Sequence, residues 1–157
     1  MSDMRAETLN IGDDSGRSWG NVFVGSSIVF NILVSGVYVA TKFGNEALLE
    51  TCGTLVIFLM LPYTYTLLEC VKEKNEKKVV ISNIVILTYL FSELLLDYVL
   101  RIPFREIFIV HVFYIMLFYA TEFSIVSVSF YLNRKMGFVV TLTFFILLTC
   151  LAYLYLG

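Results

Sequence analysis

Five stretches of this chain are each apolar over about the 20 residues that a helix needs to cross a bilayer. They run from about Gly20 to Phe43, Ala47 to Val71, Val79 to Leu100, Phe104 to Leu132, and Gly137 to Leu156. A segment inside hydrocarbon has to satisfy its backbone hydrogen bonds internally, so each stretch is expected to be a helix. The links are short, and consecutive helices must therefore run antiparallel. The sequence predicts an all-α integral membrane bundle of about five transmembrane helices.

The composition agrees with this class. Of 157 residues, 59% are hydrophobic and only 15% are charged, against about a quarter charged in soluble domains. The lipid bilayer is thus the expected surrounding. The net charge of −2 and the absence of a basic stripe argue against nucleic acid as a partner. Residues 1–18 are polar and acidic and predict a disordered N-terminal tail, and residues 19–157 predict a single transmembrane domain.

The lysines and arginines divide unequally between the two ends of the predicted bundle. One end would carry eight, namely Arg5, Arg17, Lys72, Lys74, Lys77, Lys78, Arg134 and Lys135. The other would carry three, namely Lys42, Arg101 and Arg105. Because cytoplasmic loops are enriched in these residues, we expect a cytoplasmic N-terminus and an outside C-terminus. The predicted location is the cell membrane, with multiple passes.

The third stretch contains three ionisable residues at a spacing of four, Glu93, Asp97 and Arg101. That spacing places successive side chains on one face of an α-helix. Glu93 lies about 12 Å below the turn between the third and fourth helices, and His111 reaches a similar depth on the fourth helix. We therefore expect Glu93 and His111 to face each other if the two helices are suitably rotated. A carboxylate at that depth has to find a partner, face water or take up a proton.

Two more carboxyl groups extend this pattern. Glu50, on the second helix, is expected at the level of Asp97, so that Glu50, Asp97, Glu93 and His111 would line an acidic pocket that opens outward. Glu122 shares a face with His111 and would form a second polar station nearer the cytoplasm. The candidate ligand- or ion-binding residues are therefore Glu93, Asp97, His111, Glu122, Glu50 and Arg101.

Other polar positions predict helix packing. Tyr89, Tyr98 and Tyr114 flank the acidic stripe and are able to hydrogen-bond to it. The amide of Asn31, in the middle of the first helix, has to bond to a neighbouring helix. Pro62 predicts a kink in the second helix.

The sequence contains no recognisable catalytic motif and specifies no cofactor. It contains no HExxH, GxSxG or P-loop motif, and its three cysteines are spaced as neither a metal site nor a redox pair. Carboxylates and one histidine are compatible with a hard divalent cation, but nothing specifies one. The ion, the cofactor and any metal are left unknown.

Three functions remain open. The first is transport or binding of a proton, a small cation or a small molecule, performed by a homo-oligomer because five spans are few for a transporter. The second is an accessory subunit whose charges pair with partner helices. The third is an enzyme for a lipid-soluble substrate, in which Glu93 and His111 act as an acid–base pair. There, Arg101 and Arg105 would hold an anionic lipid head group.

Overall fold

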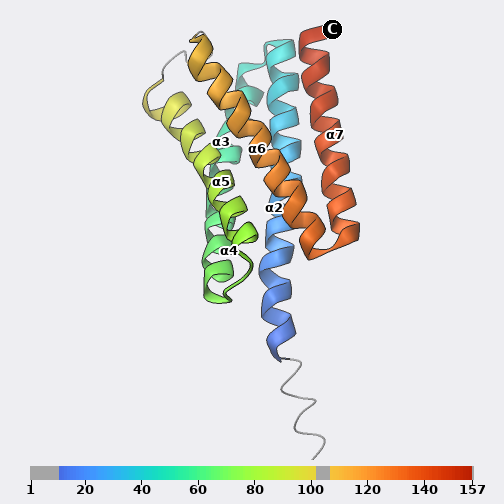
Figure 1. The fold of residues 1–157 in the computed structure, drawn as a ribbon. Coiled ribbons are helices and arrows are strands. Elements are labelled where there is room, and N and C mark those ends of the chain that lie inside the picture. Colours follow the sequence, from blue (N-terminus) through green and yellow to red (C-terminus); the bar gives the residue numbers. More distant parts are fainter. Residues whose placement is uncertain (1–10, 102–106, 157) are drawn as a thin grey trace, which may run out of the picture.

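The chain folds into a bundle of long helices, and the first and last helices of its described part begin and finish at opposite ends of the bundle (Figure 1). The computed structural model describes the backbone of residues 11–101 and 107–156, and side chains from residue 18 onward in those ranges. Its elements are α2 (Ile11–Phe43), α3 (Glu46–Phe58), α4 (Met60–Lys72), α5 (Lys77–Glu93), the π-helix η1 (Leu94–Val99), α6 (Phe108–Leu132) and α7 (Arg134–Leu156). No strand occurs in these ranges.

Five helices are long and apolar enough to cross a membrane, as predicted. They are Ser18–Phe43, Glu46–Lys72, Lys77–Val99, Phe108–Leu132 and Arg134–Leu156. Helix α2 already begins at Ile11, so the second half of the segment predicted to be a polar tail is helical. The first ten residues of that tail, and the predicted turn with Pro103 and Arg105, lie outside the described residues.

Helix α2 is the central element of the bundle. It packs against α3, α4, α6 and α7, while α5 packs against α4 and α6. The contacts are largely aromatic: Phe23 meets Tyr63 edge-on at 5.6 Å between ring centroids, and Phe30 meets Tyr89 in the same way at 5.9 Å. Edge-to-face pairs of this kind add about 0.5–1.5 kcal/mol to the burial of the rings themselves. The core is therefore organised around α2, and the other helices are arranged about it.

The outer surface is apolar on every described span. Phe108 is 79% exposed, Phe43 70% and Leu61 69%, and only 11% of the most apolar window of α7 is buried. A contiguous apolar surface of this extent is rare on a soluble monomer. Lipid chains solvate such a surface without penalty, so the exposed residues agree with a multi-pass membrane protein.

The second span is broken in its middle, as Pro62 predicts. Helix α3 ends at Phe58, Leu59 forms a turn, and α4 begins at Met60. Helix α3 ends four residues before Pro62, because the proline ring clashes with the carbonyl of Phe58 and offers no N–H to it. Thr66, one turn beyond the proline, has its hydroxyl 2.8 Å from Asn83 Oδ1 and so ties α4 to α5.

Trp19 secures the start of the first span. Its indole ring is only 3% exposed, and Nε1 donates to Glu73 Oε2 at 2.8 Å. Glu73 ends α4. The indole therefore joins α2 to the α4–α5 turn rather than facing lipid.

Two helix ends share one turn geometry with different residues. After α2, Asn45 N–H donates to the Ala40 carbonyl (2.9 Å) and Gly44 has a φ of +65°. After α4, Asn75 N–H donates to the Cys70 carbonyl (3.0 Å) and Lys74 has a φ of +52°. Both are Schellman motifs, in which one residue adopts the left-handed conformation that glycine accepts most readily.

Replacing Lys74 by glycine is therefore expected to raise the free energy of unfolding by about 0.5–1 kcal/mol, because it relieves the left-handed strain. The reciprocal change, Gly44→Ala, is expected to lower it by about 1 kcal/mol. Both are measured by unfolding the protein in detergent micelles and following the helical circular dichroism. A Lys74→Gly variant less stable than the wild type would contradict the assignment of this turn.

Candidate functional site

Glu93 is held by two tyrosine hydroxyls. Tyr89, one turn earlier on α5, donates to Glu93 Oε1 at 2.6 Å, and Tyr114 on α6 donates to the same oxygen. The two tyrosine oxygens lie 2.9 Å apart. Charge-assisted hydrogen bonds of this kind are roughly twice as strong as neutral ones. The expected hydrogen bonding to the acidic stripe is confirmed for Tyr89 and Tyr114, and it joins α5 to α6.

The partner of Glu93 across the helices is thus Tyr114, and no hydrogen bond joins Glu93 to His111 among the described residues. Glu93 lies six residues before η1 ends at Val99, and Tyr114 lies six residues after α6 begins at Phe108. His111 lies only three residues into α6 and is one turn too close to the helix end. The expectation placed the start of this helix at Phe104, four residues too early.

The π-helix changes the spacing of the acidic stripe. Asp97 remains close enough to Glu93 for the two carboxyl groups to interact directly. Arg101 does not continue the stripe, because the helix ends at Val99 and Arg101 has a φ of +48°. Its side chain is exposed. Asp97 therefore lies next to Glu93, as the spacing of four predicts, whereas Arg101 does not lie on the same helix face.

Two further predicted members of the acidic pocket do not join Glu93. Glu50 is exposed on α3. His111 is half-buried, and its Nδ1 is shielded from solvent without a hydrogen-bond partner among the described residues. The described residues also contain no group of three or more His, Cys, Asp or Glu side chains able to hold a metal ion. The predicted four-membered pocket is thus reduced to Glu93 and Asp97 with two tyrosines.

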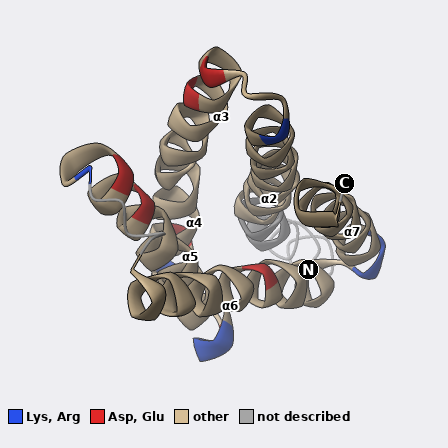
Figure 2. Cartoon of the chain, turned by 90° about the horizontal axis from the view of Figure 1, so that it is seen from above, with Lys and Arg blue, Asp and Glu red and all other residues tan. Residues whose placement is uncertain are grey.

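Glu122 forms a separate site in the middle of the bundle. It is the acidic position on α6 in Figure 2, and it is fully buried. One end of the Asn31 amide, from α2, lies 3.0 and 3.2 Å from the two Glu122 carboxyl oxygens. The other end lies 2.8 Å from Thr143 Oγ1 on α7. The amide expected to bond to a neighbouring helix therefore bridges two of them.

Thr143 is the residue of this site that the sequence did not indicate. It lies 112 residues from Asn31, and no spacing rule relates two helices so far apart in the chain. Its only signal is a hydroxyl in an otherwise apolar span, which α7 also has at Thr141 and Thr149. Those two donate to carbonyls of their own helix.

Tyr38 and Phe118 lie between the two carboxyl sites. Tyr114 and Glu122 are eight residues apart on α6, about 12 Å along the axis. Phe118 is buried between them and packs against Tyr89 with 5.7 Å between ring centroids. The Tyr38 hydroxyl, from α2, lies within electrostatic range of both Glu93 and Glu122. It is the polar group that links the surroundings of the two sites.

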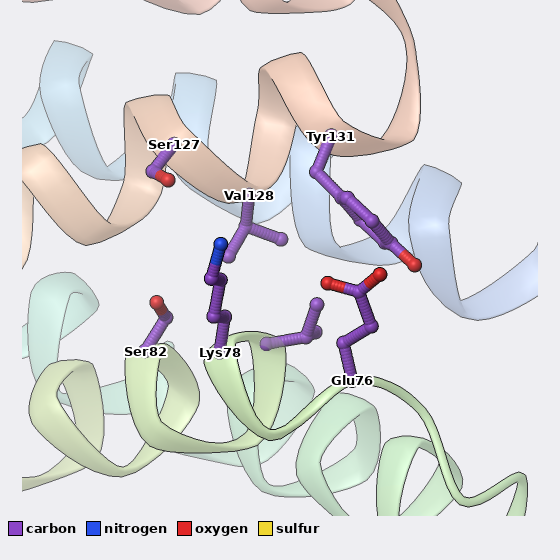
Figure 3. A pocket seen from close by; sticks show the side chains of 7 residues that line it. Glu76, Lys78, Ser82, Ser127, Val128 and Tyr131 are labelled. Atoms are coloured by element: carbon purple, nitrogen blue, oxygen red, sulfur yellow. The ribbon is translucent and has the colours of Figure 1, made fainter.

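A small polar pocket opens between α5 and α6 at the end of the bundle that carries the α4–α5 turn (Figure 3). Its volume is about 150 Å³, and it is lined by Glu76, Lys78, Val79, Ser82, Ser127, Val128 and Tyr131. Ser127 lies five residues beyond Glu122 on the same helix. Thr121 precedes Glu122 on α6 and Ser129 follows Ser127, and the buried hydroxyls of both have no partner among the described residues. Orphaned hydroxyls of this kind are places where water binds inside proteins.

A second, apolar groove of about 510 Å³ separates α3 and α4 from η1. Tyr98 closes one side of it, with its hydroxyl 3.4 Å from Thr54 Oγ1. A Cβ at Gly53 would lie 2.8 Å from the same hydroxyl, so the glycine allows this approach.

Comparison with protein-family models, curated proteins and solved structures finds no match. Function is therefore inferred from these two carboxyl sites, their burial and their partners.

Proposed function

We propose that the protein is a multi-pass protein of the cell membrane that binds a small cation inside its helix bundle and conducts it by way of Glu93 and Glu122. One observation carries the proposal. Each of these carboxyl groups lies within a helix long and apolar enough to span a membrane, and among the described residues neither forms an ion pair with a basic side chain. Ionisable groups inside a membrane are rare and usually mark an ion pathway.

The arrangement supports a path with two stations. Glu93 and Asp97 lie toward the end that carries the C-terminus, and Glu122 lies about 12 Å further along α6. The polar pocket with Ser82 and Ser127 offers access from the opposite end. Tyr38 supplies a hydroxyl in the region between the stations, where Phe118 otherwise excludes water.

The distribution of basic residues supports an orientation. The α4–α5 and α6–α7 turns lie at the same end as the start of α2 (Figure 1). Among the described side chains, that end carries Lys72, Lys74, Lys77, Lys78, Arg134 and Lys135, and the opposite end carries Lys42 and Arg101. By the positive-inside rule the first of these ends faces the cytoplasm, and the C-terminus lies outside.

Liposomes that contain the purified protein and an entrapped pH-sensitive dye test this function. With a potassium gradient and valinomycin as the driving force, we expect ion flux above that of empty vesicles. Glu93→Gln is expected to reduce it on the order of tenfold or more, because the ion loses its charged ligand while the side chain keeps its shape. The matched control is Glu46→Gln, an exposed glutamate at the start of α3, which should leave the flux unchanged.

Separate assays with sodium and potassium identify which cation moves. Flux equal to that of empty vesicles for every ion would overturn the proposal and favour an accessory subunit, which should then purify with a stoichiometric membrane partner. Glu93 is hydrogen-bonded to Tyr89 and Tyr114, and His111 Nδ1 has no partner among the described residues, so these contacts lend no support to the acid–base pair of the enzyme alternative.

A further inference from the structure

The Asn31 amide lies between a carboxyl group and a hydroxyl group, and each of those can act as donor or acceptor. One terminal atom of the amide lies 3.0 and 3.2 Å from the Glu122 oxygens, and the other lies 2.8 Å from Thr143 Oγ1. Thr143 Oγ1 in turn lies 2.7 Å from the Val140 carbonyl of its own helix. An amide has a donating and an accepting end of nearly equal shape, so both orientations fit the same space.

Each orientation of the Asn31 amide matches one protonation state of Glu122. With an ionised carboxylate, the amide nitrogen donates to both Glu122 oxygens, and the Thr143 hydroxyl donates to the amide oxygen. With a protonated carboxyl, Glu122 donates to the amide oxygen, the amide nitrogen donates to Thr143, and Thr143 donates to the Val140 carbonyl. In both arrangements each polar atom of the Asn31 amide has at least one partner, and the two arrangements differ by a single proton.

We infer that Glu122 is a proton-binding site and that its occupancy is transmitted to α7 by rotation of the Asn31 amide. In the binding step, an incoming proton forms an O–H bond with the Glu122 carboxylate. The amide then turns over, and the Thr143 proton moves its hydrogen bond from Asn31 to Val140. No electron is transferred and no other covalent bond changes. The inference rests on the proposed function, and it specifies the proton as the ion held at this station.

The surroundings of Glu122 favour a proton over a metal cation. The titratable groups within its electrostatic range are Tyr38 on α2 and Tyr63 on α4, both with neutral hydroxyls. Asn31 and Thr143 supply the polar groups from α2 and α7, and no charged group of α5 is in range among the described residues. A metal ion requires several oxygen ligands and room for them. Glu122 is fully buried, and a proton requires no additional space.

Infrared spectroscopy of the protein in lipid nanodiscs tests the proton site. Among the carboxyl C=O bands that appear during a pH titration, we expect one, corresponding to one proton per chain, to belong to Glu122. The band should vanish in Glu122→Gln, persist in Glu93→Gln, and shift in frequency in Asn31→Leu, where the carboxyl loses its partner. If the band is unchanged in Glu122→Gln, or if sodium or potassium suppresses it at constant pH, the assignment to a proton at Glu122 is overturned.

The rotation of the amide has its own readout in ¹⁵N-labelled protein. The side-chain amide resonance of Asn31 should titrate together with the carboxyl band in the wild type and be constant in Glu122→Gln. Asn83 is the matched control, because its buried amide bonds to Thr66 and to the Val79 carbonyl, away from any carboxyl group. An Asn31 resonance that does not move while the band titrates would overturn the coupling.

These outcomes separate the inference from the proposed function. Vesicle flux without a titrating Glu122 band would support ion conduction and contradict the proton site. A titrating band in a protein that conducts no ion would support the proton site and contradict conduction.

Discussion

Replacing Asn31 by leucine is expected to lower the free energy of unfolding by about 3 kcal/mol, because the buried Glu122 loses its only hydrogen-bond partner in the described structure. Single hydrogen bonds between transmembrane helices contribute about 0.6 kcal/mol on average. The larger value is expected here because the substitution leaves a carboxyl group unpaired in a site with no exposed surface. Unfolding by sodium dodecyl sulfate in mixed micelles, followed by circular dichroism, measures the difference.

Two further variants show whether the loss comes from Glu122. In the Asn31→Leu, Glu122→Leu double variant no polar group is left unpaired at this contact, so most of the lost stability should return. Thr143→Val keeps the shape of the side chain and removes one neutral hydrogen bond, for an expected loss of about 1 kcal/mol. Additive losses in the double variant would contradict the contact between Asn31 and Glu122.

Gly137→Ala is expected to destabilise the bundle by about 3 kcal/mol, the upper part of the range for an overpacked core. Gly137 is buried in the first turns of α7. A Cβ there would lie 2.5 Å from two ring atoms of Phe130 and 2.9 Å from its backbone Cα. The ring can turn away, but the backbone of α6 can move only together with its helix, so α6 and α7 would have to separate. Unfolding in the same micelles measures the loss.

Gly25→Ala is the matched control for this substitution. Gly25 also lies in a helix, but a Cβ there meets nothing within 4 Å. The change should raise the free energy of unfolding by about 0.5–1 kcal/mol through helix propensity alone. Equal effects of the two substitutions would show that the contact of Gly137 with Phe130 does not limit the approach of α6 and α7.

The spans could be predicted closely because each depends on local composition. The expected limits of the second span, Ala47 to Val71, differ by one residue at each end from those observed. The break before Pro62 was predictable for the same reason, since it follows from the ring and the missing N–H of one residue. The start of α6 was predicted four residues early, because Pro103 favours a helix that begins directly after it and hydropathy does not reveal the first helical residue.

The candidate site was predicted only in part. Glu93, Asp97 and Glu122 were correctly placed within the apolar spans, and Tyr89 and Tyr114 beside the acidic stripe. His111 and Glu50 were expected in one pocket with Glu93, and Arg101 on the same helix face, on the assumption of regular helices with symmetric ends. The end of η1 at Val99 takes Arg101 off that face, and the later start of α6 places His111 nearer the helix end.

Hydropathy along the chain is sufficient to predict an all-helical bundle with five membrane-length spans, because a backbone in hydrocarbon has few other ways to satisfy its hydrogen bonds. The partners of the buried polar groups depend instead on the rotation and height of each helix relative to its neighbours. Those are set by packing between residues far apart in the chain, such as Phe30 with Tyr89. The contacts of Glu93 with Tyr114 and of Asn31 with Glu122 and Thr143 therefore emerged only once the helices were assembled.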